Sequence, residues 1–93
     1  MIKSFNCKET ELIYALKGSR KLPSDIQRKA LRKLEMLDAA IEVNDLRVPP
    51  ANRLEALKGK RKGQYSIRIN KQWRVCFVWS SGHVYQVEIV DYH

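Results

Sequence analysis

The chain has 93 residues, 44% of them hydrophobic, and a formal net charge of +8 from 18 Lys and Arg against 10 Asp and Glu. This size predicts one domain over residues 1–93 with a single core, and the hydrophobic content excludes a disordered chain. No window approaches the ~18 consecutive apolar residues of a membrane-spanning helix, and the N-terminus has no signal-peptide pattern. We therefore expect a soluble, cytoplasmic protein with no membrane partner.

The positive charge is concentrated in two windows. Residues 17–33 hold seven basic residues and one acidic residue, and residues 58–74 hold seven basic residues and no acidic residue. Such clustering favours a polyanionic partner, because each neutralised phosphate releases counterions and adds affinity that does not depend on sequence. A merely solvated face is the alternative, and a membrane surface is less favoured because no helix has an inserting Trp, Phe and Leu face. We expect nucleic acid or the ribosome.

The first half of the chain is predicted to be helical. We expect a short edge strand at residues 2–5, then a helix over residues 8–17 that ends at Gly18. A longer helix over residues 24–41 should begin with a capping box made by Ser24 and Gln27. A spacing of three or four residues predicts one apolar, core-facing stripe on this helix. The stripe consists of Ile26, Ala30, Leu34, Leu37 and Ile41.

The other side of the longer helix carries two rows of like charge. Arg28 with Arg32, and Lys29 with Lys33, are each four residues apart. Repulsion within each row costs roughly a few tenths of a kcal/mol. We hypothesise that an anionic partner relieves this repulsion, so these four residues are predicted to bind RNA or the ribosome.

The second half of the chain changes to a period of two. A polar connection over residues 42–53 contains Pro49 and Pro50, which stop a helix. Alternating apolar residues then predict strands over 65–69, 73–79 and 85–90, joined by tight turns. One sheet face should pack on the helices, and the other should gather Ser66, Arg68, Arg74, Gln86 and Glu88. The predicted fold class is α+β, with two N-terminal helices packed on an antiparallel β-sheet.

The open face of this sheet carries residue types that suit RNA cleavage. Cleavage through the 2′-hydroxyl requires a proton acceptor, cations for the phosphorane, and an acid for the 5′-oxygen. Arg68, Arg74 and Lys58 can supply the positive charge. His93 is the natural acid, because imidazole titrates near neutrality, and Tyr92 would stack on a base or donate a proton.

Strand geometry sets a condition on this site. Strict alternation puts Asp91 and His93 on the face of Tyr85, away from Arg74. The last strand must therefore end or twist near Val90 for the site to assemble. With two histidines and no clustered cysteines, the sequence predicts neither a metal site nor a cofactor.

Four sequence segments resemble the HigB branch of the RelE/ParE toxin superfamily. They are MIKSF at the start, LEMLDAA at 34–40, NRLEALKGKRKGQYSIRINKQWRVCF at 52–77 and VEIVDYH at the end. The resemblance covers nearly the whole chain. It implies two helices against an antiparallel sheet, and a type II toxin that acts as a ribosome-dependent mRNA endonuclease in the decoding A site. It also implies a cognate HigA-like helix-turn-helix antitoxin, with operator DNA bound only through that antitoxin.

The resemblance also implies roles for individual residues. Lys58 matches the lysine of the family's LKG motif, Arg74 matches the arginine of WR, and Asp91, Tyr92 and His93 match the terminal catalytic cluster. Some members carry His where this chain has Glu55, so Glu55 is either the general base or a bystander, and Asp91 is either the base or an orienting group. Four further basic residues of the second window are expected to contact RNA, namely Lys60, Arg61, Lys62 and Arg68.

Two other functions remain open at this stage. The first is a ParE-like inhibitor that blocks DNA gyrase through protein contacts, although such an inhibitor has no need for a terminal Asp-Tyr-His. The second is a plain RNA-binding module without cleavage. RNA fragments in the presence of ribosomes would distinguish the nuclease from both.

Overall fold

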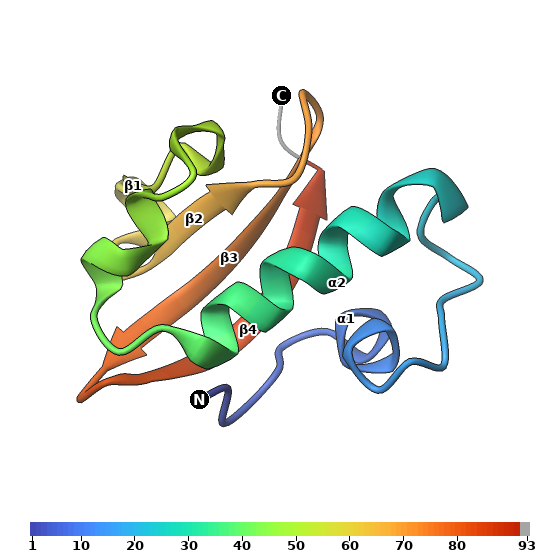
Figure 1. Cartoon of the computed structure of the whole chain (residues 1–93), viewed down its shortest axis with the longest axis horizontal. Coiled ribbons are helices and arrows are strands. Elements are labelled where there is room, and N and C mark those ends of the chain that lie inside the picture. The colour runs from blue at the N-terminus through green and yellow to red at the C-terminus, as the bar shows by residue number, and fades with distance from the viewer. Residues whose placement is uncertain (92–93) are drawn as a thin grey trace.

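Two helices and a four-stranded antiparallel sheet make up the computed structural model, which describes residues 1–91 (Figure 1). The sheet has the order β1-β2-β3-β4, so each strand pairs with its neighbour in sequence. The helices are α1 (Lys8–Tyr14) and α2 (Ser24–Ala39), and the strands are β1 (Glu55–Ala56), β2 (Tyr65–Arg68), β3 (Trp73–Ser80) and β4 (His83–Asp91). Three short 3-10 turns lie between α2 and β2, namely η1 (Val43–Arg47), η2 (Pro50–Asn52) and η3 (Gly59–Arg61). The predicted α+β fold class is confirmed.

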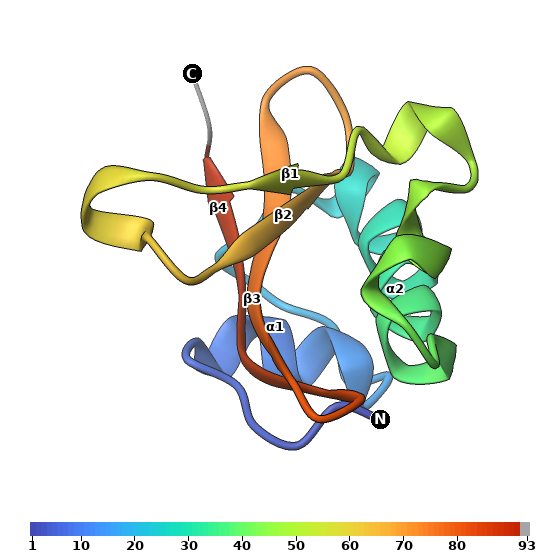
Figure 2. The same cartoon turned by 90° about the vertical axis from the view of Figure 1, so that its left-hand side faces the viewer.

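Helix α2 lies against one face of the sheet, while the segment that contains η3 stands on the opposite side (Figure 2). The apolar stripe of α2 packs on β3 and β4, where Val75, Phe77 and Val87 are fully buried. Within residues 1–91, no helix has the length and apolarity needed to cross a membrane. Among the described residues, no α-helix covers the sheet face under η3 (Figure 2).

The predicted ends of both helices are wrong. Helix α2 ends at Ala39 because Ala40 adopts an extended backbone, so Ile41 leaves the predicted stripe and is 80% exposed. Helix α1 ends at Tyr14, because Leu16 has a positive φ of 64° and turns the chain before Gly18. Both departures are set by backbone conformations that apolar periodicity does not encode.

The predicted capping box of α2 is also wrong. The residue before the helix is Pro23, and within residues 1–91 no side chain caps the first turn. Gln27 instead reaches back to the preceding loop, where its Oε1 accepts the amide of Ser19 at 3.1 Å. Its Nε2 donates to the carbonyl oxygens of Ser19 at 2.8 Å and Leu22 at 2.9 Å. Gln27 therefore fixes the loop between the helices.

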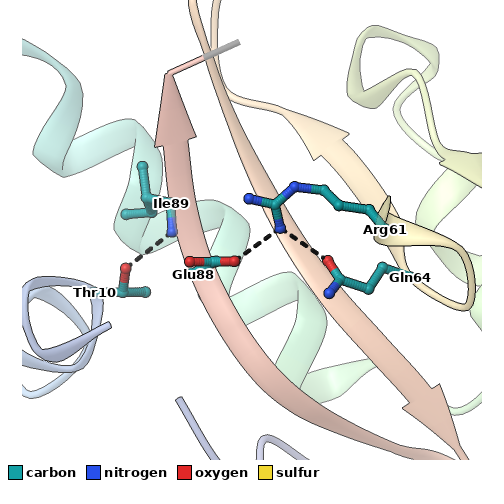
Figure 3. Close-up of polar contacts among 5 residues, drawn as sticks. All are labelled: Thr10, Arg61, Gln64, Glu88 and Ile89. Carbon is teal, nitrogen blue, oxygen red and sulfur yellow. Dashed lines mark hydrogen bonds and ion pairs between the residues drawn. The ribbon is translucent and has the colours of Figure 1, made fainter. Parts of the chain in front are cut away.

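The N-terminal segment pairs with the outer edge of β4 but does not form a regular strand. Two isolated parallel bridges join Ile2 to Val84 and Phe5 to Val87. The amide of Lys3 donates to the carbonyl of Val84 at 2.7 Å. Further along, the buried hydroxyl of Thr10 on α1 accepts the amide of Ile89 at 3.0 Å (Figure 3). The predicted edge strand at residues 2–5 is thus reduced to two bridges, and α1 continues the cover of the β4 edge.

A β-bulge interrupts the alternation of β4. Cys76 pairs with Glu88 and Val78 pairs with Tyr85, so Phe77 stands opposite two residues of β4. Gln86, in this bulge, has a positive φ of 55°. Because of the extra residue, Tyr85 lies on the same sheet face as Glu88. Strict alternation predicts that Tyr85 lies on the opposite face, together with the buried Val87. The predicted face of Tyr85 is therefore wrong.

The connection between α2 and the sheet is held by one buried amide. Asn52 is fully buried, and its Nδ2 donates to the carbonyl oxygens of Leu46 at 3.1 Å and Val48 at 3.5 Å. Its Oδ1 accepts a hydrogen bond from Nζ of Lys33 on α2. Asn52 therefore ties η1, η2 and α2 together, immediately before Arg53.

Candidate active site

The open face of the sheet is built from two rows of cross-strand neighbours. One row runs through Glu55, Ser66, Cys76 and Glu88. The next row runs through Arg68, Arg74 and Val90. Directly paired residues share a face, so these side chains project from the face opposite the core-facing Val75 and Phe77. Arg68, at the end of β2, also reaches a cavity that α2 borders. The strands thus bring residues from four parts of the sequence onto one surface.

Arg74 lies under this surface and is only 8% exposed. Its Nε donates to Oγ of Ser66 at 2.7 Å, and its Nη2 donates to the carbonyl oxygen of Arg53 at 2.7 Å. Arg53 presents that carbonyl from a left-handed conformation with φ of 46°. A guanidinium held by such bonds has a fixed orientation, which suits an electrostatic role better than a mobile grip on RNA.

The LKGKRKG motif forms η3 above the open face. Gly59 and Gly63 flank the basic residues with φ of 64° and 95°, values that side-chain-bearing residues rarely adopt. From this turn Arg61 reaches across β3, and its Nη1 donates to Oε1 of Glu88 at 2.8 Å and to Oε1 of Gln64 at 3.1 Å (Figure 3). The hydrogen bond to Glu88 raises the pKa of Arg61. Arg61 therefore links η3 to β4, and the carboxylate of Glu88 partly neutralises its charge.

A cavity of about 450 Å³ lies between η3 and β1. Its lining residues are Glu55, Ala56, Leu57, Lys58, Lys60 and Arg61. The structure therefore brings the candidate base Glu55 together with Lys58 and two further predicted RNA-binding cations. A carboxylate beside several cations can accept a proton next to a bound phosphate.

The described end of β4 lies on the other side of the sheet. Asp91 pairs with Trp73, whose ring packs towards the core, and Oδ2 of Asp91 accepts Nε2 of Gln72 at 3.1 Å. Asp91 therefore points away from the face of Arg74, as alternation predicts. Among the described residues, it does not line the Glu55 cavity. The predictions for Tyr92 and His93 lie outside the described residues.

The predicted RNA-binding residues divide between separate places. Lys29, Arg32 and Lys33 line a second cavity, of about 570 Å³, together with Arg68. Arg28 faces a different hollow between the two helices, and Lys62 is exposed after η3. Arg53 and Lys71 also line the second cavity, and the sequence alone did not indicate either of them. They lie in turns, where no periodic signal indicates which way a side chain points.

The thiols and carboxylates do not suggest a metal centre in the described part of the chain. Residues 1–91 contain no cluster of three or more His, Cys, Asp or Glu side chains that could hold a metal ion. Cys76 is fully buried and Cys7 is half-buried, and both are free thiols. Burial raises the pKa of the Cys76 thiol, so it remains a neutral packing group. Metal-independent action itself stays a prediction.

Comparisons with known proteins agree with the architecture. The fold matches that of a chain from the YoeB-YefM complex of Staphylococcus aureus with a TM-score of 0.63 at 22% identity. The match spans 100% of this chain and 95% of that chain. It matches a YafQ mutant from E. coli with a TM-score of 0.62 at 14% identity, over 98% of this chain and 91% of that one. At these identities, the likenesses show the fold alone.

Sequence relatives are more informative about the family. The chain is 53% identical over 66 residues to Toxin HigB-1 of Vibrio cholerae, a match that spans 71% of this chain and 70% of that protein. It is 31% identical over 93 residues to Endoribonuclease HigB of Proteus vulgaris, which covers 100% of both chains. The model of the RelE-like toxin of the type II toxin-antitoxin system HigB matches residues 3–93. This chain therefore belongs to the HigB-like family of RelE-like toxins from type II toxin-antitoxin systems.

Proposed function

We propose that this toxin is an endoribonuclease that cleaves mRNA in the ribosomal A site by metal-independent acid–base chemistry. The observation that carries the proposal is the cavity on the open face, where Glu55 meets Lys58, Lys60 and Arg61. The relative from Proteus vulgaris carries the name endoribonuclease, which supports the same reaction class.

The reaction requires one proton to leave and one to arrive. A carboxylate accepts the proton of the 2′-hydroxyl, the 2′-oxygen forms a bond to phosphorus, and the bond from phosphorus to the 5′-oxygen breaks. Lys58 and the buried Arg74 stabilise the negative charge of the phosphorane. His93 donates a proton to the 5′-oxygen, and Tyr92 stacks on a neighbouring base. The products are a 2′,3′-cyclic phosphate and a free 5′-hydroxyl.

Geometry favours Glu55 over Asp91 as the base. Glu55 lines the same cavity as Lys58, whereas Asp91 leaves β4 on the side of Trp73 and accepts a hydrogen bond from Gln72. A general base must be within hydrogen-bond reach of the proton it removes, near the cations that hold the phosphate. We assign Asp91 the role of positioning the residues that follow it.

The partners follow from the family. Two of the structural neighbours are complexes named YoeB-YefM, one of them titled a toxin-antitoxin heterotetramer, which supports an antitoxin partner for this chain. We propose a HigA-like helix-turn-helix antitoxin, with operator DNA contacted only through it. Action on mRNA and the ribosome would make the cytoplasm the site of activity.

The test is cleavage of a defined mRNA programmed on purified ribosomes. Glu55→Gln and Lys58→Gln should each lower the cleavage rate by about 10²–10⁴-fold, the range expected for a general base or a charge-stabilising group. Deletion of residues 91–93 should abolish both cleavage and growth arrest. Glu11→Gln and Lys8→Gln change the same charges on the exposed surface of α1 and should keep full activity.

Two further measurements test metal independence and ribosome dependence separately. Cleavage that persists in excess EDTA supports metal independence, and cleavage that vanishes when ribosomes are omitted supports ribosome dependence. Full activity of the Glu55 and Lys58 variants would remove both residues from the site. Growth arrest by a cleavage-dead variant, accompanied by DNA damage signalling, would favour the gyrase-inhibitor alternative.

A further inference from the structure

The cavity beside α2 has an unusual charge distribution. Ten described residues line it, of which six are cations and none is acidic. The cations are Lys29, Arg32, Lys33, Arg53, Arg68 and Lys71. The cavity under η3 and the hollow that contains Arg20 and Lys21 each include one glutamate. The α2 cavity is therefore a concentrated site of positive charge without an internal counter-charge from its described lining.

The cations of the α2 cavity repel one another electrostatically. Burial and the positive charge of Lys29 lower the pKa of Lys33, because both disfavour its charged form. Lys33 is nevertheless fixed by its hydrogen bond to Asn52, and Nε of Arg68 donates to the carbonyl of Asn70 at 2.9 Å. A bound anion would offset the repulsion.

The cavity adjoins the candidate active site along the edge of the sheet. Arg68 is the cross-strand neighbour of Arg74, and the carbonyl of Arg53 accepts the hydrogen bond from Nη2 of Arg74. Strand β1 pairs with β2 at Tyr65 and Ser66. The cavity lies beyond the end of this pairing, next to Arg68. Figure 1 shows the elements that border it, namely α2, the segment after η2, and the turn between β2 and β3.

We propose that the α2 cavity binds backbone phosphates of RNA at nucleotides away from the cleaved bond, as a subsite that holds RNA while the open face cleaves it. This inference rests on the proposed nuclease function. An RNA backbone presents repeated charges that cations from three elements can meet together. An acidic protein segment is less suited, because the apolar contacts that the described lining offers to an anchoring side chain are limited to Met36, Ala51 and Ile69.

The experiment compares two charge-matched double variants. Lys29→Gln with Arg32→Gln removes two cations from the cavity, and Arg20→Gln with Lys21→Gln removes two exposed cations from the loop before α2. Affinity is measured against salt concentration, with a fluorescent 2′-O-methyl RNA oligonucleotide and, separately, with purified ribosomes. The slope of log affinity against log salt should fall by about 0.7 for each lost single-strand phosphate contact. The loop variant should keep the slope of the parent.

A third double variant controls for a change in the helix propensity of α2. Arg53→Gln with Lys71→Gln removes cations from turns, so a similar fall in slope cannot come from altered helix propensity. In the cleavage assay, the cavity variants should raise KM with little change in kcat, because they weaken binding of substrate and transition state alike. Urea unfolding of each variant verifies that the fold is retained.

Each outcome bears on the proposal. If the salt slope of the cavity variants falls with the oligonucleotide, the bound phosphates belong to the mRNA strand. If the slope falls only with ribosomes, the phosphates belong to ribosomal RNA. Both results support an RNA subsite. An unchanged slope, an equal fall in the loop variant, or weaker binding of the antitoxin alone would overturn it. A parent protein that binds RNA through the cavity but never cleaves it would refute the nuclease function and leave the subsite standing.

Discussion

Nη1 of Arg61 lies 2.8 Å from Oε1 of Glu88, and this ion pair joins η3 to β4 across the intervening strand β3. The two side chains are 38% and 23% exposed. Since Arg61 also lines the cavity that contains Glu55, the pair fixes one wall of the candidate active site. It connects two residues that are 27 positions apart in the sequence.

The first prediction concerns the strength of this pair. A double-mutant cycle of Arg61→Gln and Glu88→Gln, measured by urea unfolding, should give a coupling free energy of about 0.2–1 kcal/mol, because the pair is partly exposed. In about 1 M salt, where the Debye length is about 3 Å, the coupling should shrink. Lys60→Gln in place of Arg61→Gln should show no coupling with Glu88. A coupling that is equally large for Lys60 would contradict a specific pair.

The second prediction concerns the support of Arg74. Ser66→Ala removes the oxygen that accepts from Nε of the buried guanidinium, so unfolding should become easier by about 1.5–3 kcal/mol. The same variant should lower kcat for cleavage, because Arg74 loses a fixed orientation. Ser80→Ala, at the exposed end of β3, should change stability by no more than about 0.5 kcal/mol. Equal effects of the two serine variants in urea would argue against the Arg74 contact.

The third prediction concerns Asn52. Asn52→Ala leaves two carbonyl oxygens and Nζ of Lys33 without their amide partner, and should destabilise the fold by about 1–3 kcal/mol in urea unfolding. Asn44→Ala removes an exposed amide whose Oδ1 accepts a hydrogen bond from Nε of Arg47 at 3.1 Å, and should be nearly neutral. If Asn52→Ala also proved neutral, the connection between α2 and β1 would not depend on this amide.

The fourth prediction concerns pH and Cys76. Burial raises the pKa of this thiol above its ordinary value of 9.0, so above that pH the unfolded chain loses a proton that the folded chain keeps. The contribution of Cys76 to stability is therefore fully present below pH 9.0 and declines as the pH rises further. The free energy of unfolding of the parent should fall more steeply above this pH than that of Cys76→Ala.

Alkylation provides a control for the burial of Cys76. In the native protein, iodoacetamide should modify the half-buried Cys7 before the fully buried Cys76, and unfolding should expose both. Rapid native modification of Cys76 would show that the thiol is accessible and remove the basis of the pH prediction.

The sequence predicts most of the fold because its apolar pattern follows the sheet and α2. Ile26, Ala30, Leu34 and Leu37 are all buried, at the spacing the helix requires. The predictions from sequence are wrong where the backbone conformation changes without a change in the apolar pattern. The bulge at Gln86 is an example, since a polar residue with a positive φ gives no periodic signal there.

The candidate site is less predictable than the fold. The LKGKRKG motif indicates positive charge near Glu55, and the structure does bring Lys58, Lys60 and Arg61 to one cavity with it. The pairing of Arg61 with Glu88 depends on the order of the strands and on where η3 folds back, which local pattern does not specify. Arg53 and Lys71 join the α2 cavity for the same reason, through contacts made only in the folded chain.

The N-terminal segment along β4 has a consequence for assembly. Its backbone occupies donors and acceptors of β4 at Val84 and Val87, groups that would otherwise form an exposed strand edge. Exposed edges promote intermolecular strand pairing and aggregation. A toxin shortened by its first six residues would therefore be prone to self-association, and an affinity tag is better separated from Met1 by a flexible spacer than fused directly to it.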